Sequence, residues 1–141
     1  MRAFLLIFFA SLCVPAGALA QISDIQAILQ ENRALIEESS RRSIEPAIAA
    51  IAESGLPSAQ TVLQRWQAKE LYQTPDDGLF YYGAALENGM IRLFRFSDGA
   101  QLGDFDSASL ARINPNSGIR ALIGSALVRF QLDDPDPQRR R

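Results

Sequence analysis

The chain has 141 residues, of which 48% are hydrophobic and 21% charged, and its 14 basic and 16 acidic side chains leave a formal net charge of −2. This length suits one globular domain, and the charge balance offers no basic field for nucleic acid. Histidine is absent and Cys13 is the only cysteine. These absences exclude a Ser-His-Asp or Cys-His nucleophile and a zinc site built on His or Cys.

Residues 1–20 have the three-part plan of a secretory signal. A positive start at Arg2 precedes an apolar run over 3–14, and Ala18-Leu19-Ala20 offers a cleavage site before Gln21. The alternative is an uncleaved anchor, although the run is short for a helix crossing a ~30 Å hydrocarbon core. We therefore expect a periplasmic protein whose residues 21–141 form a single domain without cysteine.

Residues 21–69 are predicted to be helical. Apolar residues recur at helical spacing over 22–38, which indicates an amphipathic helix beginning near Ser23 and Asp24. Two shorter helices follow, one ended by Ser54-Gly55 and one opened by Pro57. Their buried sides are expected to carry Ile44, Ile48, Ile51, Val62, Leu63 and Trp66. This helical pair with its Gly-x-Pro corner resembles one HEAT-type repeat.

Residues 70–105 are predicted to form strands. The dipeptides Asp77-Gly78, Asn88-Gly89 and Asp98-Gly99 each lie between apolar runs and predict tight hairpin turns with positive φ at both central positions. The strands are expected at about 70–74, 79–85, 90–96 and 101–105, as an antiparallel meander. In the third strand Ile91 and Leu93 alternate with Arg92 and Phe94, and the pattern leaves open which face is buried.

The rest of the chain returns to helix over 106–132. Asp106 is expected to cap a single helical turn over 107–112, and an apolar stripe of Ile119, Leu122, Ile123, Ala126, Leu127 and Phe130 predicts a long helix. Residues 133–141 begin with acid-proline pairs that mark the start of a further, truncated helix. The predicted class is therefore α+β, with HEAT-like α-helical pairs flanking a small antiparallel β-meander.

No pattern of residues predicts catalysis. The carboxylate pairs Asp76-Asp77 and Asp104/Asp106 could bind metal or act in acid–base chemistry, but a turn and a helix cap explain them more simply. The glycines are scattered among turns, without a phosphate loop. Lys69, the sole lysine, lies at a predicted helix end. We expect a non-enzymatic protein with no catalytic, cofactor-binding or metal-binding residues.

Aromatic residues are concentrated in the strand region. They could form the core of a small sheet or a surface that recognises a partner, and the second use would favour Tyr81, Tyr82, Phe94 and Phe96. We therefore name these four residues as the candidate site for binding a protein partner.

Several short motifs follow one another in a fixed order. They are Glu70-Leu71-Tyr72, the Asp-Asp-Gly turn at 76–78, Asp98-Gly99-x-x-Leu102-Gly103, Leu110-x-x-Ile113-x-x-Asn116-x-x-x-Arg120, Ala126-Leu127 and Leu132-x-x-Pro135-Asp136-Pro137-x-x-Arg140. Together, over roughly residues 42–141, they resemble the periplasmic N-terminal extension of the urea ABC transporter permease, of the branched-chain amino acid permease class. In that family the extension precedes membrane helices, and nothing after residue 20 resembles one.

The resemblance implies an exported accessory domain of a urea-type permease, as a docking module or a truncated permease. Its partners would be a solute-binding protein or permease subunits, with no nucleic acid. Membrane contact would come only through the missing permease part or an uncleaved signal, and a full-length permease would place the domain at the inner membrane. The alternative is a stand-alone periplasmic protein-interaction module unrelated to transport.

Overall fold

The computed structural model describes residues 23–133 and 136–138. The predicted signal at 1–20, and most of the predicted helix start at 133–141, lie outside these residues. Within the described part, no helix combines the length and the apolar composition that a membrane crossing requires.

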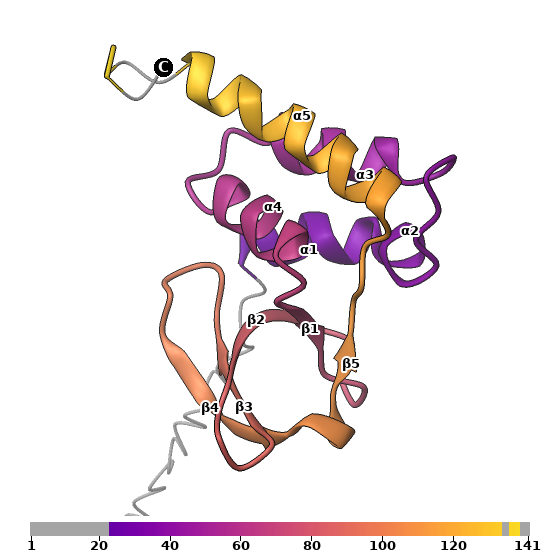
Figure 1. Cartoon of the computed structure of the whole chain (residues 1–141), viewed down its shortest axis with the longest axis vertical. Helices are drawn as coiled ribbons and strands as arrows, with labels where there is room; N and C mark the ends of the chain where they lie inside the picture. Colours follow the sequence, from indigo (N-terminus) through magenta and orange to yellow (C-terminus); the bar gives the residue numbers. More distant parts are fainter. Residues whose placement is uncertain (1–22, 134–135, 139–141) are drawn as a thin grey trace, which may run out of the picture.

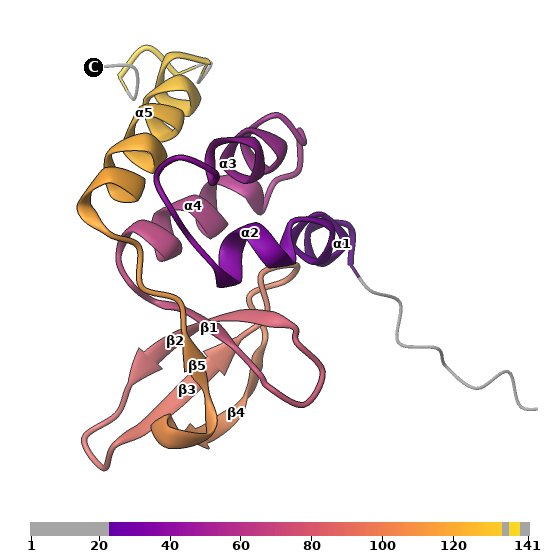
Figure 2. The ribbon, with the colours of Figure 1, turned by 90° about the vertical axis from the view of Figure 1, so that its right-hand side faces the viewer.

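The helices pack together at one end of the molecule and a curled sheet forms the other, with α3 and α5 farther from the sheet than α4 (Figures 1 and 2). The helices are α1 (Asp24–Glu31), α2 (Arg33–Glu37), α3 (Glu45–Ala52), α4 (Ala59–Gln67) and α5 (Ser117–Asp133). Helices from both sides of the strand region in sequence pack together, since α5 contacts both α3 and α4. The predicted α+β class is confirmed, while the HEAT-like character of the helical pairs stays a prediction.

The single helix expected over 22–38 is interrupted at Asn32. Ser23 caps α1 as expected, with its hydroxyl accepting from the Gln26 amide. At Asn32, which has φ −103° and ψ 12°, the side-chain amide donates to the Ile28 carbonyl at 2.9 Å. Asparagine competes in this way for helical backbone groups, so α2 starts as a separate short helix.

The sheet contains the four predicted strands and one that the sequence did not predict. They are β1 (Leu71–Gln73), β2 (Phe80–Ala85), β3 (Met90–Phe94), β4 (Gln101–Asp106) and β5 (Ala111–Arg112), in the antiparallel order β4-β3-β2-β1-β5. The helical turn expected over 107–112 is only a 3-10 turn, Ser107–Ser109, capped by Asp106 as predicted. The expectation that 106–132 is entirely helical is thus wrong, because β5 forms only by pairing with the distant β1.

The three hairpin turns share one backbone geometry, which differs from the predicted geometry. In each, the glycine has a φ between 69° and 76°, but the preceding Asp or Asn does not have a positive φ. The oxygen of that side chain instead accepts from the backbone amide two residues ahead, at 2.9–3.1 Å. This Asx geometry needs only one left-handed residue. The loops are accordingly longer than two residues, as the 2.8 Å bond from Leu86 N to Met90 O shows for the second.

Helix α4 ends in a Schellman motif built without glycine. The Glu70 amide donates to the Arg65 carbonyl at 2.8 Å, and the Lys69 amide donates to the Trp66 carbonyl at 3.0 Å. Lys69 has φ 62°, the only positive value among the described residues other than glycine. The helix end predicted at Lys69 is confirmed, and this lysine holds a conformation that usually selects glycine.

Both faces of the sheet are partly buried. The helix-facing side joins the main core, where Trp66, Phe80 and Leu71 are inaccessible. The opposite, concave side holds a second cluster of Tyr72, Tyr81, Ile91 and Leu93 with Leu79, Phe105 and Leu110 packed against it. In the third strand it is therefore Ile91 and Leu93 that are buried, and Met90, Arg92 and Phe94 are half-buried. Of the apolar stripe on α5, Ile119, Ile123 and Ala126 are buried and the rest only partly.

A glutamine joins the helical layer to the sheet. Gln26 on α1 donates through Nε2 to the Phe80 carbonyl and accepts through Oε1 from the Phe80 amide, both at 2.9 Å. Strand β3 pairs with β2 only from Tyr82 onward. Gln26 thus supplies the two hydrogen bonds that a neighbouring strand would otherwise make at Phe80. Beside it, Gln30 and Gln73 both donate to the Gly78 carbonyl, at 2.8 Å and 3.0 Å.

We predict that Gln26→Met lowers the free energy of unfolding by about 1–3 kcal/mol, because it leaves both buried backbone groups of Phe80 unpaired. Methionine keeps the length of the side chain, so the loss isolates the hydrogen bonds. Urea denaturation measures it. The matched control is Gln101→Met at an exposed strand position, and equal stability of the two variants would contradict this role of Gln26.

The hydrogen bond between Gln73 of β1 and Glu37 of α2 should make the free energy of unfolding depend on pH in the acid range. Hydrogen bonds from Gln73 and then Arg33 lower the pKa of Glu37 from 4.5. A lowered folded-state pKa stabilises the fold above the unfolded pKa, and that stabilisation is lost as the pH falls through the folded value. We expect Glu37→Gln to lose less stability than the parent between neutral pH and pH values below 4.5. Glu87→Gln, which removes a carboxylate with no hydrogen-bond partner among the described residues, should leave the acid dependence unchanged.

Candidate functional site

Three of the four predicted site residues come together on the helix-facing side of the sheet. The register of β2 and β3 places Tyr82 opposite Phe94, and their rings stack with centroids 5.2 Å apart and planes inclined by 15°. Phe96, just beyond β3, lies 5.2 Å from Tyr82 at 48°. We call Tyr82 and Phe94, backed by Phe96, the aromatic surface.

The members of the aromatic surface differ in accessibility. Phe96 is 6% exposed and belongs to the main core, whereas Tyr82 and Phe94 are half-buried. Phe96 therefore supports the Tyr82 ring from the core side, and it is Tyr82 and Phe94 that a partner could touch.

Tyr81, the fourth predicted residue, is on the other side of the sheet. Its side chain is 8% exposed within the concave cluster, and burial raises the pKa of Tyr81. Successive residues of a strand point to opposite faces, so Tyr81 and Tyr82 do not share a surface. The structure assigns Tyr81 to packing.

Arg65 of α4 is a neighbour that the sequence did not reveal. Its guanidinium carbon lies 4.6 Å from the centroid of the Tyr82 ring, and its Nη1 donates to Glu70 Oε2 at 2.6 Å. Such a cation–π contact holds the ring in place. No spacing in the sequence could indicate it, because α4 and β2 meet only through the tertiary fold.

Ion pairs border the aromatic surface. Two residues before Phe94, Arg92 donates to Asp104 through Nε at 2.8 Å and through Nη2 at 3.2 Å. The hydrogen bond to Arg92 lowers the pKa of Asp104. Arg95 pairs similarly with Asp98, whose pKa is lowered first by the backbone amide of Ala100. The charges at this border are thus balanced.

The turn role predicted for Asp77 and the cap role predicted for Asp106 are confirmed, whereas Asp104 pairs with an arginine side chain. Asp77 accepts from the Leu79 amide in its turn, and Asp106 caps the 3-10 turn. Asp104 forms an ion pair with Arg92. Across residues 23–133 and 136–138, no group of three or more acidic, histidine or cysteine side chains is placed to hold a metal ion.

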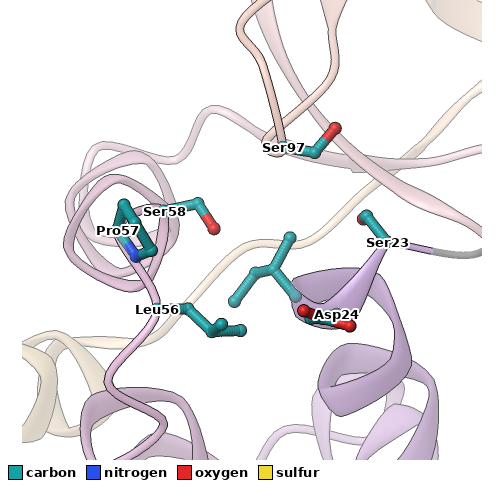
Figure 3. Close-up of a pocket in the computed structure, with 7 residues that line it drawn as sticks. Ser23, Asp24, Leu56, Pro57, Ser58 and Ser97 are labelled. Atoms are coloured by element: carbon teal, nitrogen blue, oxygen red, sulfur yellow. The ribbon is translucent and has the colours of Figure 1, made fainter.

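A pocket of about 460 Å³ includes Ser97, the residue after Phe96, in its lining (Figure 3). It lies between the start of α1, the loop before α4 and the β3–β4 turn, and is lined by Ser23, Asp24, Ile25, Leu56, Pro57, Ser58 and Ser97. Its polar groups are three hydroxyls and one carboxylate, with no basic side chain. One of these hydroxyls, that of Ser23, already caps α1. The pocket offers no nucleophile paired with a basic side chain.

Comparisons with protein families, with curated proteins and with solved structures find no match to this chain.

We predict that the buried Tyr81 contributes more to the free energy of unfolding than the half-buried Phe94. Tyr81→Ala should lower the free energy of unfolding by about 3–5 kcal/mol, the range for emptying a buried aromatic site. Phe94→Ala should cost clearly less, because its ring is partly in solvent. Thermal and urea unfolding of both variants measure the difference, and equal losses would show that Phe94 belongs to the core.

Proposed function

We propose that this chain is an exported, non-catalytic docking domain, the accessory domain of a urea-type ABC transporter permease, and that its aromatic surface binds a protein on the periplasmic side. The observation that carries the proposal is the stacked, half-exposed pair of Tyr82 and Phe94. Aromatic residues of this kind are favoured as anchors in protein interfaces.

The geometry of the pair supports this use. Strand pairing and mutual stacking hold both rings, and Tyr82 is also held by Phe96 and by Arg65. Because their conformations are already restricted, binding would cost little side-chain entropy. The Arg92–Asp104 ion pair at the border resembles the polar rim that surrounds an interface core.

The positions of the ordered motifs also support the proposal. Tyr72 and Leu71 form β1, Gly99 takes the left-handed turn position, and the Asn116 side chain accepts from the Ile119 amide at 2.9 Å to start α5. These motif residues thus have roles in strands, turns and caps, which a related domain would need for the same reasons.

Calorimetric titration of residues 21–141 tests the proposal, since every residue of both core clusters lies within 23–133. We expect heat of binding with a urea-binding solute-binding protein and none with urea alone. The double variant Tyr82→Ala, Phe94→Ala should weaken binding by roughly 30-fold or more, the effect of losing an interface anchor. The matched control is Leu102→Ala, at a 41% exposed leucine on β4, which should bind normally.

Two results would count against the proposal. Sub-millimolar binding of urea to the domain alone would make it a ligand-binding domain rather than a docking module. Absence of binding to the solute-binding protein would remove the transporter connection and favour a stand-alone interaction module.

A further inference from the structure

Five cations lie at one end of the molecule without an acidic partner. They are Arg41, Arg42, Lys69, Arg112 and Arg120; all are exposed, and none makes an ion pair with any described residue. We call them the basic face. By contrast, the other arginines of the sheet, Arg92 and Arg95, are both paired with aspartates.

Tertiary contacts bring the five cations together from four separate segments. A Cβ built at Gly118 would lie 2.6 Å from Arg41 Cδ, so the Arg41 stem crosses the first turn of α5. Arg112 Nε donates to the Lys69 carbonyl at 2.9 Å, and Gln67 Nε2 donates to the Arg120 carbonyl at 3.2 Å. Figure 2 shows the loop before α3, the end of α4, the top of β5 and the start of α5 converging on the left of the view.

The acids near the basic face do not cancel it. Glu70, next to Lys69, is held by Arg65, and Glu37 is held by Arg33 and Gln73. Glu38 and Glu45 remain, so five cations face two unpaired acids. The hairpins over 74–106 show the reverse balance, with six acidic residues and two arginines. Arg129, near the end of α5, also has no ion pair, but it lines a pocket together with the acidic residues Glu53 and Asp133. The basic face thus holds five of the six described cations that have no ion pair.

We infer that the basic face binds an anionic phospholipid surface. Lipid headgroups present many phosphates in a plane, which suits cations spread over an end of the molecule rather than gathered in a pocket. Each lysine or arginine close to such a surface strengthens binding about fivefold, within roughly 10 Å and at low ionic strength.

This inference is independent of the proposed docking. The basic face occupies the β1–β5 side of the sheet, whereas the aromatic surface belongs to β2 and β3.

Co-sedimentation of residues 21–141 with lipid vesicles tests whether the basic face binds anionic phospholipid. We expect binding to vesicles of phosphatidylglycerol and phosphatidylcholine, little binding to phosphatidylcholine alone, and weakening with added salt. Arg42→Gln, Arg120→Gln should reduce binding about 25-fold, as two cations are lost. Neither side chain makes a hydrogen bond or ion pair with a described residue, so the fold should survive, which circular dichroism checks. Arg92→Gln, Arg95→Gln changes the net charge equally and should bind as the parent does.

Three results would overturn the inference. Equal binding to neutral vesicles would show that charge does not drive the contact, and equal losses in the two double variants would show that only net charge matters. Failure of the folded parent to bind anionic vesicles at low salt would mean that the basic face serves another partner or none.

Discussion

The two hydrogen bonds between the Gln26 side chain and the Phe80 backbone connect the helical layer to the sheet. They set where β2 begins relative to α1, and Tyr82 follows two residues later on the same face. The position of Tyr82 then determines where Phe94 and Phe96 meet it. The accessible aromatic pair is therefore a consequence of how one buried amide completes the hydrogen bonding of a strand that extends beyond its neighbour.

The hairpin turns influence the distribution of charge as well as the chain path. Each uses an Asp or Asn oxygen to satisfy the backbone, so acidic residues concentrate where the strands reverse. The arginines in this region are bound by aspartates. Among the described residues, five of the six cations without an ion pair lie where the loop before α3, the end of α4, β5 and the start of α5 meet, and the sixth is Arg129 near the end of α5. The uneven distribution of acidic and basic side chains over the molecule thus follows in part from the hydrogen bonds that the turns require.

Local patterns predicted much of the fold. Helical spacing located Val62, Leu63 and Trp66 on the buried side of α4, and the turn dipeptides located all four strands of the meander. Features that depend on distant contacts were missed: β5, which exists only beside β1, and Arg65, which meets Tyr82 through the tertiary fold. Of the four residues named as the candidate site, Tyr82, Phe94 and Phe96 lie together, and Tyr81 lies on the other face because strand residues alternate. Their use in binding a partner stays a prediction.

The lone lysine has a practical consequence for mapping partners. Lys69 is the only side-chain amine in the chain, and its left-handed conformation at the end of α4 leaves it exposed beside Arg112. Amine-reactive cross-linkers and labels will therefore report on that end of the molecule and, apart from the chain's α-amine, nowhere else. Lys69 precedes Leu71, the strand partner of Tyr82, by two residues, so a cross-link from Lys69 would also report a protein bound over Tyr82. Carboxylate-directed reagents at Asp98 or Asp104 would report the same protein from the other side of the aromatic surface.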